Sequence, residues 1–139
     1  MPAPPFTLEG LDHVVLLVRD MERARHFYCD VLGMREGFRP KLGFAGYWLY
    51  VGDTASIHIG EWASYSVWTK EVGIPISTPA ASTGAVDHIA FNASGFDEMR
   101  ARLKSHGIEP SENLLDEIGL RQLFIYDPNG VPIELNFRS

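Results

Sequence analysis

Apolar residues follow two patterns along this chain: short continuous runs, and stripes with a spacing of three to four residues. Residues 11–18 form an almost unbroken apolar run, which is typical of a strand covered on both faces. Helical spacing follows, and Asp20 and Gly33 stand where a helix would begin and end. The pattern predicts a strand and then a helix whose buried stripe is Met21, Ala24, Phe27, Tyr28, Val31 and Leu32.

The second half of the chain repeats the plan of the first. In the first half we predict a weak strand near 34–40 and two clearer strands near 47–51 and 55–60, joined by a turn at Gly52 and Asp53. In the second half, a strand at 86–93 precedes a helix in which Ser94 and Asp97 form a capping box and Gly107 marks the end. Strands near 120–126 and 131–137 follow, joined by the turn-forming residues 127–130. Each half is therefore a predicted βαβββ module.

Short segments of the two halves also match in sequence. LDHVV at 11–15 returns as VDHIA at 86–90, and SIHI at 56–59 returns as PIEL at 132–135, about 75 residues later in both cases. This repeat predicts two similar modules packed about a pseudo-twofold axis. It places a potential metal ligand at two equivalent strand positions in each module: His13, His58, His88 and Glu134.

Strand alternation predicts the face on which these side chains lie. His13 shares its face with Val15, whereas Val14 and Leu16 take the face available to the helix. In the last strand Glu134 and Asn136 point away from the apolar row, toward the concave side of the sheet. A buried carboxylate without a partner costs several kcal/mol, and a cation shared with three imidazoles would remove that cost. These residues therefore predict a site for a divalent metal.

The chain divides into a first module over about 8–61, a linker over 62–84 and a second module over about 85–139. The linker is rich in Ser, Thr, Ala, Gly and Pro and shows no clear periodicity, so we predict a crossing segment that also serves as a lid. It contains Trp62, Tyr65 and Trp68. Two interpretations of these aromatic residues stay open: they cover a sheet edge or subunit contact, or they contact a substrate.

Composition narrows the partners and the compartment. With 139 residues and 45% hydrophobic content, the chain fits one domain of ordinary size. The net charge of −6 without a basic cluster argues against nucleic acid and anionic membranes as partners. No apolar run approaches the roughly 20 residues of a membrane span, and the first residues lack the pattern of a signal peptide. Cys29 is the single cysteine, so no intrachain disulfide can form, and a cytoplasmic location is expected.

Taken together, these segments resemble the vicinal-oxygen-chelate superfamily, which includes glyoxalase I, extradiol dioxygenases, methylmalonyl-CoA epimerase and the fosfomycin and bleomycin resistance proteins. The resemblance rests on LDHVVLLVRDMERARHFYCDVLGM at 11–34, SIHIGE at 56–61, VDHIAF at 86–91 and FIYDPNGVPIELNF at 124–137. It implies an α+β fold in which two βαβββ modules form an open, cup-shaped mixed sheet. It also implies a homodimer, a small-molecule substrate, and one divalent metal (Zn, Ni, Co, Mn or Fe) on His13, His58, His88 and Glu134.

The resemblance leaves three functions open. Glyoxalase- or epimerase-like proton transfer, by a lyase or isomerase, is favoured because His58 occupies the fourth ligand position; Glu134 would then be both ligand and base. An extradiol dioxygenase would use His13, His88 and Glu134 on Fe(II) or Mn(II), with His58 as an acid–base group. Phe124 stands where extradiol enzymes carry a tyrosine, and Tyr126 is displaced from that position. The third function is non-catalytic binding of a small molecule, as in resistance proteins.

Aromatic residues accompany the candidate ligands on the predicted concave face. The repeat pairs Trp48 with Phe124 and Tyr50 with Tyr126. With Gln122, these residues are predicted to line a mostly apolar pocket for a planar or hydrophobic substrate. For Trp48 and Phe124, packing above the sheet is an alternative interpretation.

Overall fold

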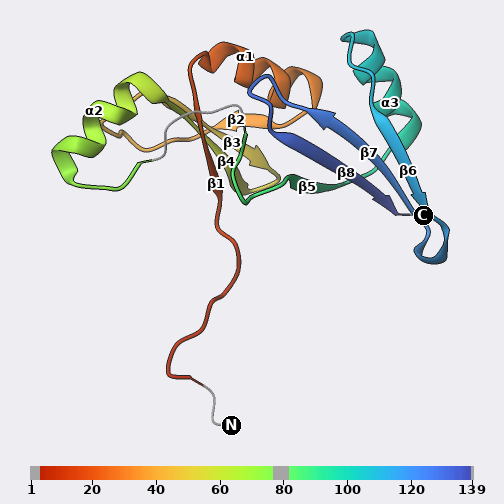
Figure 1. Ribbon diagram of the computed structural model, residues 1–139, viewed down its shortest axis with the longest axis horizontal. Helices are drawn as coiled ribbons and strands as arrows, with labels where there is room; N and C mark the ends of the chain where they lie inside the picture. Colours follow the sequence, from red (N-terminus) through yellow and green to blue (C-terminus); the bar gives the residue numbers. More distant parts are fainter. Residues whose placement is uncertain (1–3, 77–81, 139) are drawn as a thin grey trace.

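Two four-stranded mixed sheets form the body of the protein, one from each predicted module (Figure 1). The computed structural model describes residues 4–76 and 82–138. The first sheet has the order β1-β4-β3-β2 and the second the order β5-β8-β7-β6, so the two halves share one topology. In each sheet the first strand pairs in parallel with the last, and the other pairs are antiparallel. The α+β fold with duplicated modules is therefore confirmed.

In the first module, the elements lie close to their predicted positions. The Asp20 carboxylate accepts hydrogen bonds from the backbone of Glu22 and Arg23, and Gly33 ends the helical segment with a φ of 86°. The last turns of this segment are π-helical rather than α-helical. The elements are β1 (Val14–Val18), α1 (Met21–Arg25), η1 (His26–Val31), β2 (Arg35–Gly37), β3 (Gly46–Val51) and β4 (Thr54–Glu61).

The second module differs from prediction at the start of its helix. The predicted capping box of Ser94 and Asp97 is wrong: Gly95 is the N-cap residue, with a φ of 81° and no side-chain cap. Only glycine adopts this conformation readily, and Asp97 pairs with Arg100 instead. The elements are β5 (Ile89–Ala93), α3 (Phe96–Ser105), β6 (Ser111–Leu115), η2 (Asp116–Ile118), β7 (Leu120–Tyr126) and β8 (Pro132–Arg138).

The linker contains a helix that its sequence pattern did not predict. Helix α2 (Trp62–Val72) follows β4 directly and ends at Gly73, which has a φ of 74°. Its aromatic residues Trp62, Tyr65 and Trp68 recur at a spacing of three, and two of them pack on one ring: Tyr65 and Trp68 lie 4.7 and 5.0 Å from the ring of Phe44. The linker as a whole lacks clear periodicity, so the sequence did not indicate this helix. Residues 77–81 of the linker lie outside the described residues.

A buried hydrogen bond joins the two modules. The hydroxyl of Tyr28, a fully buried residue of η1, donates to the Asp127 carboxylate at 2.7 Å. Asp127 begins the turn between β7 and β8, and its other oxygen accepts from the backbone of Asn129 and Val131. Burial, and then the Asp127 charge, raise the pKa of Tyr28, which keeps the phenol a donor.

Among the described helices, none is long and apolar enough to cross a membrane.

Candidate functional site

The first pair of predicted ligands lies on one face of the first sheet. His13 immediately precedes β1, and His58 lies in β4 opposite Val15. The two imidazole rings stack with their centroids 3.8 Å apart, and Trp48 stacks on the other face of His58 at 4.0 Å. The opposite face of the sheet packs on the core through Val14 and other residues, as strand alternation predicted. His58 is therefore held between two rings.

The second pair lies on the equivalent face of the second sheet. His88 immediately precedes β5, and its Nε2 is 3.5 Å from Oε1 of Glu134 in β8. The Glu134 side chain is only 15% exposed. Its other oxygen accepts from the amide of Asn136, which accepts from Gln122, which in turn accepts from Asn113. This row of amides across three strands fixes the carboxylate.

An aspartate orients the histidine that precedes the first strand of each module. Asp12 contacts Nδ1 of His13 at 2.5 Å, and Asp87 contacts Nδ1 of His88 at 2.8 Å. A carboxylate on one ring nitrogen fixes the tautomer and leaves the other nitrogen available, an arrangement common around metal-binding histidines. The donor set, three imidazoles and one carboxylate, is also one that Zn, Ni, Co, Mn and Fe accept. The residues therefore fit a divalent metal.

The structure does not bring the two pairs together within one chain. Across residues 4–76 and 82–138, no cluster of three or more His, Cys, Asp or Glu side chains is arranged to hold a metal ion. Each module instead holds two neighbouring candidate ligands on its own sheet. The four-ligand centre thus stays a prediction.

A cavity of about 200 Å³ opens beside the first histidine pair. Its walls include His13, His58 and Trp48 from the sheet. Phe44, Tyr65 and Trp68 complete an aromatic side, the last two from helix α2. Tyr65 and Trp68 therefore line the cavity and also pack on Phe44, so both interpretations of the linker aromatics stay open for them. Trp62 is not among the lining residues; Arg19 lies over its ring.

The other predicted substrate-binding residues do not line this cavity. The Tyr50 hydroxyl donates to the carbonyl of Phe38, and Gln122 belongs to the amide row. Phe124 lies opposite Glu134 in the strand pairing. The side chain of Tyr126 is 70% exposed. Phe124 is therefore placed to contact a molecule held at Glu134, whereas nothing in the described structure supports such a role for Tyr50 or Tyr126.

Sequence reasoning missed the amide row and the contribution of α2. Asn136 donates to the Glu134 carboxylate from the same strand, and Asn113 of β6 is linked to it through Gln122 of β7. The alternation of Glu134 and Asn136 on one face was the available signal, but the strand register that aligns Gln122 with both asparagines is a property of the folded sheet.

The pKa values of His58 and His88 are expected to shift in opposite directions from the ordinary value of 6.5. Burial, and then the nearby charge of His13, lower the pKa of His58. The hydrogen bond that the His88 ring donates to the Asp87 carboxylate raises the pKa of His88, although burial opposes this shift. As the pH falls in metal-free protein, His88 should therefore protonate before His58. Ring-proton NMR measures both midpoints, and Asp87→Asn should lower that of His88. Coincident or reversed midpoints would contradict this assignment.

The chain belongs to the Glyoxalase/Bleomycin resistance protein/Dioxygenase superfamily, whose family model matches residues 10–135. Among curated proteins it is similar to YaeR of Escherichia coli strain K12, with 25% identity over 92% of this chain and 95% of that protein. This confirms the family resemblance seen in the four sequence segments.

Solved structures agree with the family assignment. A glyoxalase family protein of Bacillus anthracis superposes with a TM-score of 0.69 at 26% identity, over 98% of this chain and 100% of that one. The fosfomycin resistance protein FosX of Listeria monocytogenes gives 0.68 at 20% identity, over 96% of both chains. The antibiotic-binding protein TnmS3 of Streptomyces sp. CB03234 gives 0.68 at 19%, over 96% and 99%. The last two likenesses show the fold alone.

Proposed function

We propose that this protein is a metal-dependent enzyme that binds a small organic molecule through two adjacent oxygens and catalyses glyoxalase- or epimerase-like proton transfer. The observation that carries this proposal is the duplicated arrangement of aspartate, histidine and a second ligand-type side chain. In each module a carboxylate orients an imidazole that lies beside the second ligand-type side chain. That side chain is His58 in the first module and Glu134 in the second. Packing alone requires no such repetition.

We place the metal between two copies of the chain. Each module presents one pair of ligands, and the described residues of a single chain bring these pairs to no common centre. If the first module of one copy faces the second module of another, His13 and His58 meet His88 and Glu134 of the partner copy. A twofold dimer closes two such sites at once. The proposed homodimer is thus required by the site.

Each residue then has a distinct task. A bound divalent cation supplies Lewis-acid stabilisation of negative charge on the substrate oxygens. Glu134 takes up the substrate proton, and Asn136 holds the carboxylate in position for this transfer. Burial lowers the pKa of His58, which favours the neutral imidazole with its nitrogen lone pair available. Trp48 and the aromatic side of the cavity pack on the substrate and exclude water.

Complementation between two inactive variants tests both the ligands and their arrangement. One variant carries His13→Ala and His58→Ala, and the other carries His88→Ala and Glu134→Ala. Each alone should bind no metal at the site. After co-refolding, sites between chains regain about a quarter of the wild-type occupancy, because half of randomly paired dimers carry one intact site of two. Elemental analysis and metal titration measure the recovery. Metal-binding wild type with no recovery in the mixture would place the site within one chain.

Non-catalytic binding of an aromatic molecule is the second candidate. The cavity beside His58 and the fold shared with the antibiotic-binding protein TnmS3 favour it. Under this alternative, metal-free protein would bind aromatic ligands tightly and the first double variant would retain metal-independent binding through Phe44 and Trp68. Under the enzymatic proposal, substrate affinity and turnover both depend on the metal.

A further inference from the structure

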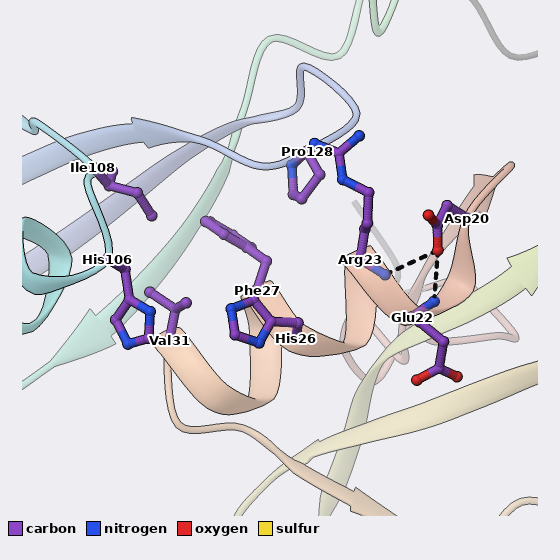
Figure 2. A pocket seen from close by; sticks show the side chains of 9 residues that line it. All are labelled: Asp20, Glu22, Arg23, His26, Phe27, Val31, His106, Ile108 and Pro128. Carbon is purple, nitrogen blue, oxygen red and sulfur yellow. Dashed lines mark hydrogen bonds between the residues drawn. The ribbon is translucent and has the colours of Figure 1, made fainter.

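A second cavity, of about 380 Å³, lies where the two modules meet (Figure 2). Its walls come from α1 and η1 of the first module, and from the segment after α3 and the β7–β8 turn of the second. Four apolar side chains form its floor: Phe27, Val31, Ile108 and Pro128. The helix that lines it packs on the core face of the first sheet, opposite the face that carries His13 and His58. This cleft is therefore separate from the candidate metal site.

The acidic groups of this cleft already have partners. Asp20 Oδ1 accepts two backbone hydrogen bonds at 3.1 Å, from Glu22 and Arg23. The Glu22 carboxylate accepts from the Tyr47 hydroxyl and from Arg25. Both carboxylates thus already accept hydrogen bonds from donors of the protein itself.

The basic groups of the same cleft are much less engaged. Within the described part of the chain, the Arg23 guanidinium has no hydrogen-bond or ion-pair partner. Nδ1 of His26 is held by Asp30 at 2.9 Å, and Asp30 also lies 3.8 Å from Arg25. The His106 ring meets the edge of the His26 ring, with centroids 5.7 Å apart. Figure 2 shows Arg23 toward one end of the cleft and the two imidazoles toward the other, with Phe27 between them.

We propose that this junction cleft binds an organic anion with a flat apolar body, such as an aromatic carboxylate. The carboxylate pairs with Arg23, and the apolar body covers Phe27 and Ile108 and reaches the imidazoles of His26 and His106. Because its walls come from both modules, the ligand bridges them and favours the docked arrangement that the Tyr28–Asp127 hydrogen bond also stabilises. This inference does not depend on the proposed metal site.

Ring-proton NMR of the histidines gives a direct test, because only two of the five histidines, His26 and His106, line this cleft. The probes are 2-naphthoate and its neutral analogue 2-naphthamide, added to metal-free protein. We expect naphthoate to shift the signals of His26 and His106 with saturation, and naphthamide to bind about tenfold more weakly because it lacks the charge that pairs with Arg23. The Arg23→Gln variant should lose this preference. The control Arg19→Gln, at a residue that lies over Trp62, should retain it.

Three results would overturn the proposal. One is the absence of any saturable shift at His26 and His106. Another is equal binding of both probes that Arg23→Gln leaves unchanged, which would show an apolar cleft without anion recognition. The third is a response confined to His13 and His58, which would place the anion in the aromatic cavity of the first sheet. Loss of metal binding in the His88→Ala, Glu134→Ala variant, by contrast, bears only on the proposed enzymatic function.

Discussion

Replacing Glu134 or His88 with alanine is expected to weaken metal binding by more than about 100-fold, the largest effect of any single substitution in this protein. Each change removes a proposed ligand. The Glu134 variant also lacks the only carboxylate among the proposed ligands, so the charge of the cation is no longer balanced there. The His88 variant lacks the imidazole whose Nε2 lies 3.5 Å from that carboxylate. Metal content after dialysis and competition titration with a chelator measure the affinity.

A graded series separates the ligands from the residues that hold them in place. Asn136→Leu and Asp87→Asn should weaken binding by about tenfold, because each removes one hydrogen bond from a ligand while the ligand itself remains. Glu117→Ala, at an exposed residue of η2, is the control and should change nothing. Full metal occupancy in both alanine variants would refute the assignment of these two ligands.

Asp127→Ala is expected to lower the free energy of unfolding by about 3 kcal/mol, because it leaves several buried donors without an acceptor. Asp127 is only 5% exposed and accepts from the Tyr28 hydroxyl and from two backbone amides of the β7–β8 turn. Tyr28→Phe removes one of these hydrogen bonds and should cost about 1 kcal/mol. Urea unfolding measures both variants and their double mutant.

The double mutant shows whether the two residues act through each other. If the hydrogen bond joins the modules as described, the cost of Tyr28→Phe should nearly vanish in the Asp127→Ala background. Asp97→Ala removes an exposed carboxylate that pairs with Arg100 and should cost less than about 0.5 kcal/mol. An Asp127→Ala protein as stable as the wild type would contradict the role of this contact.

Much of the local structure follows from sequence patterns alone. The alternation of residues in β8 separates Glu134 from its apolar neighbours, and the helical stripe places Ala24, Phe27 and Tyr28 in the core. Both patterns are reliable because burying an apolar face is the dominant stabilising contribution in a small domain. Because the same patterns occur in both halves of the chain, they also identified the duplicated modules.

Other features depend on contacts between distant segments. Helix α2 was not predicted from the linker sequence, and it packs against a distant residue, Phe44, whose ring contacts those of Tyr65 and Trp68. Gly95 replaces the expected side-chain cap because the chain turns with a positive φ before α3. His26 and His106 look like unrelated surface residues in the sequence, and only the docking of the modules brings their rings together.

The sequence by itself determined the duplicated βαβββ plan, the family, and the side of each strand on which His13, His58, His88 and Glu134 lie, because strand alternation and repetition are local properties. Only the tertiary structure decided which of these side chains are neighbours. It grouped them into one pair per sheet, because the parallel register of β1 with β4 and of β5 with β8 sets the two side chains of each pair next to one another. It also created the cleft at the junction, which exists only where the two halves meet.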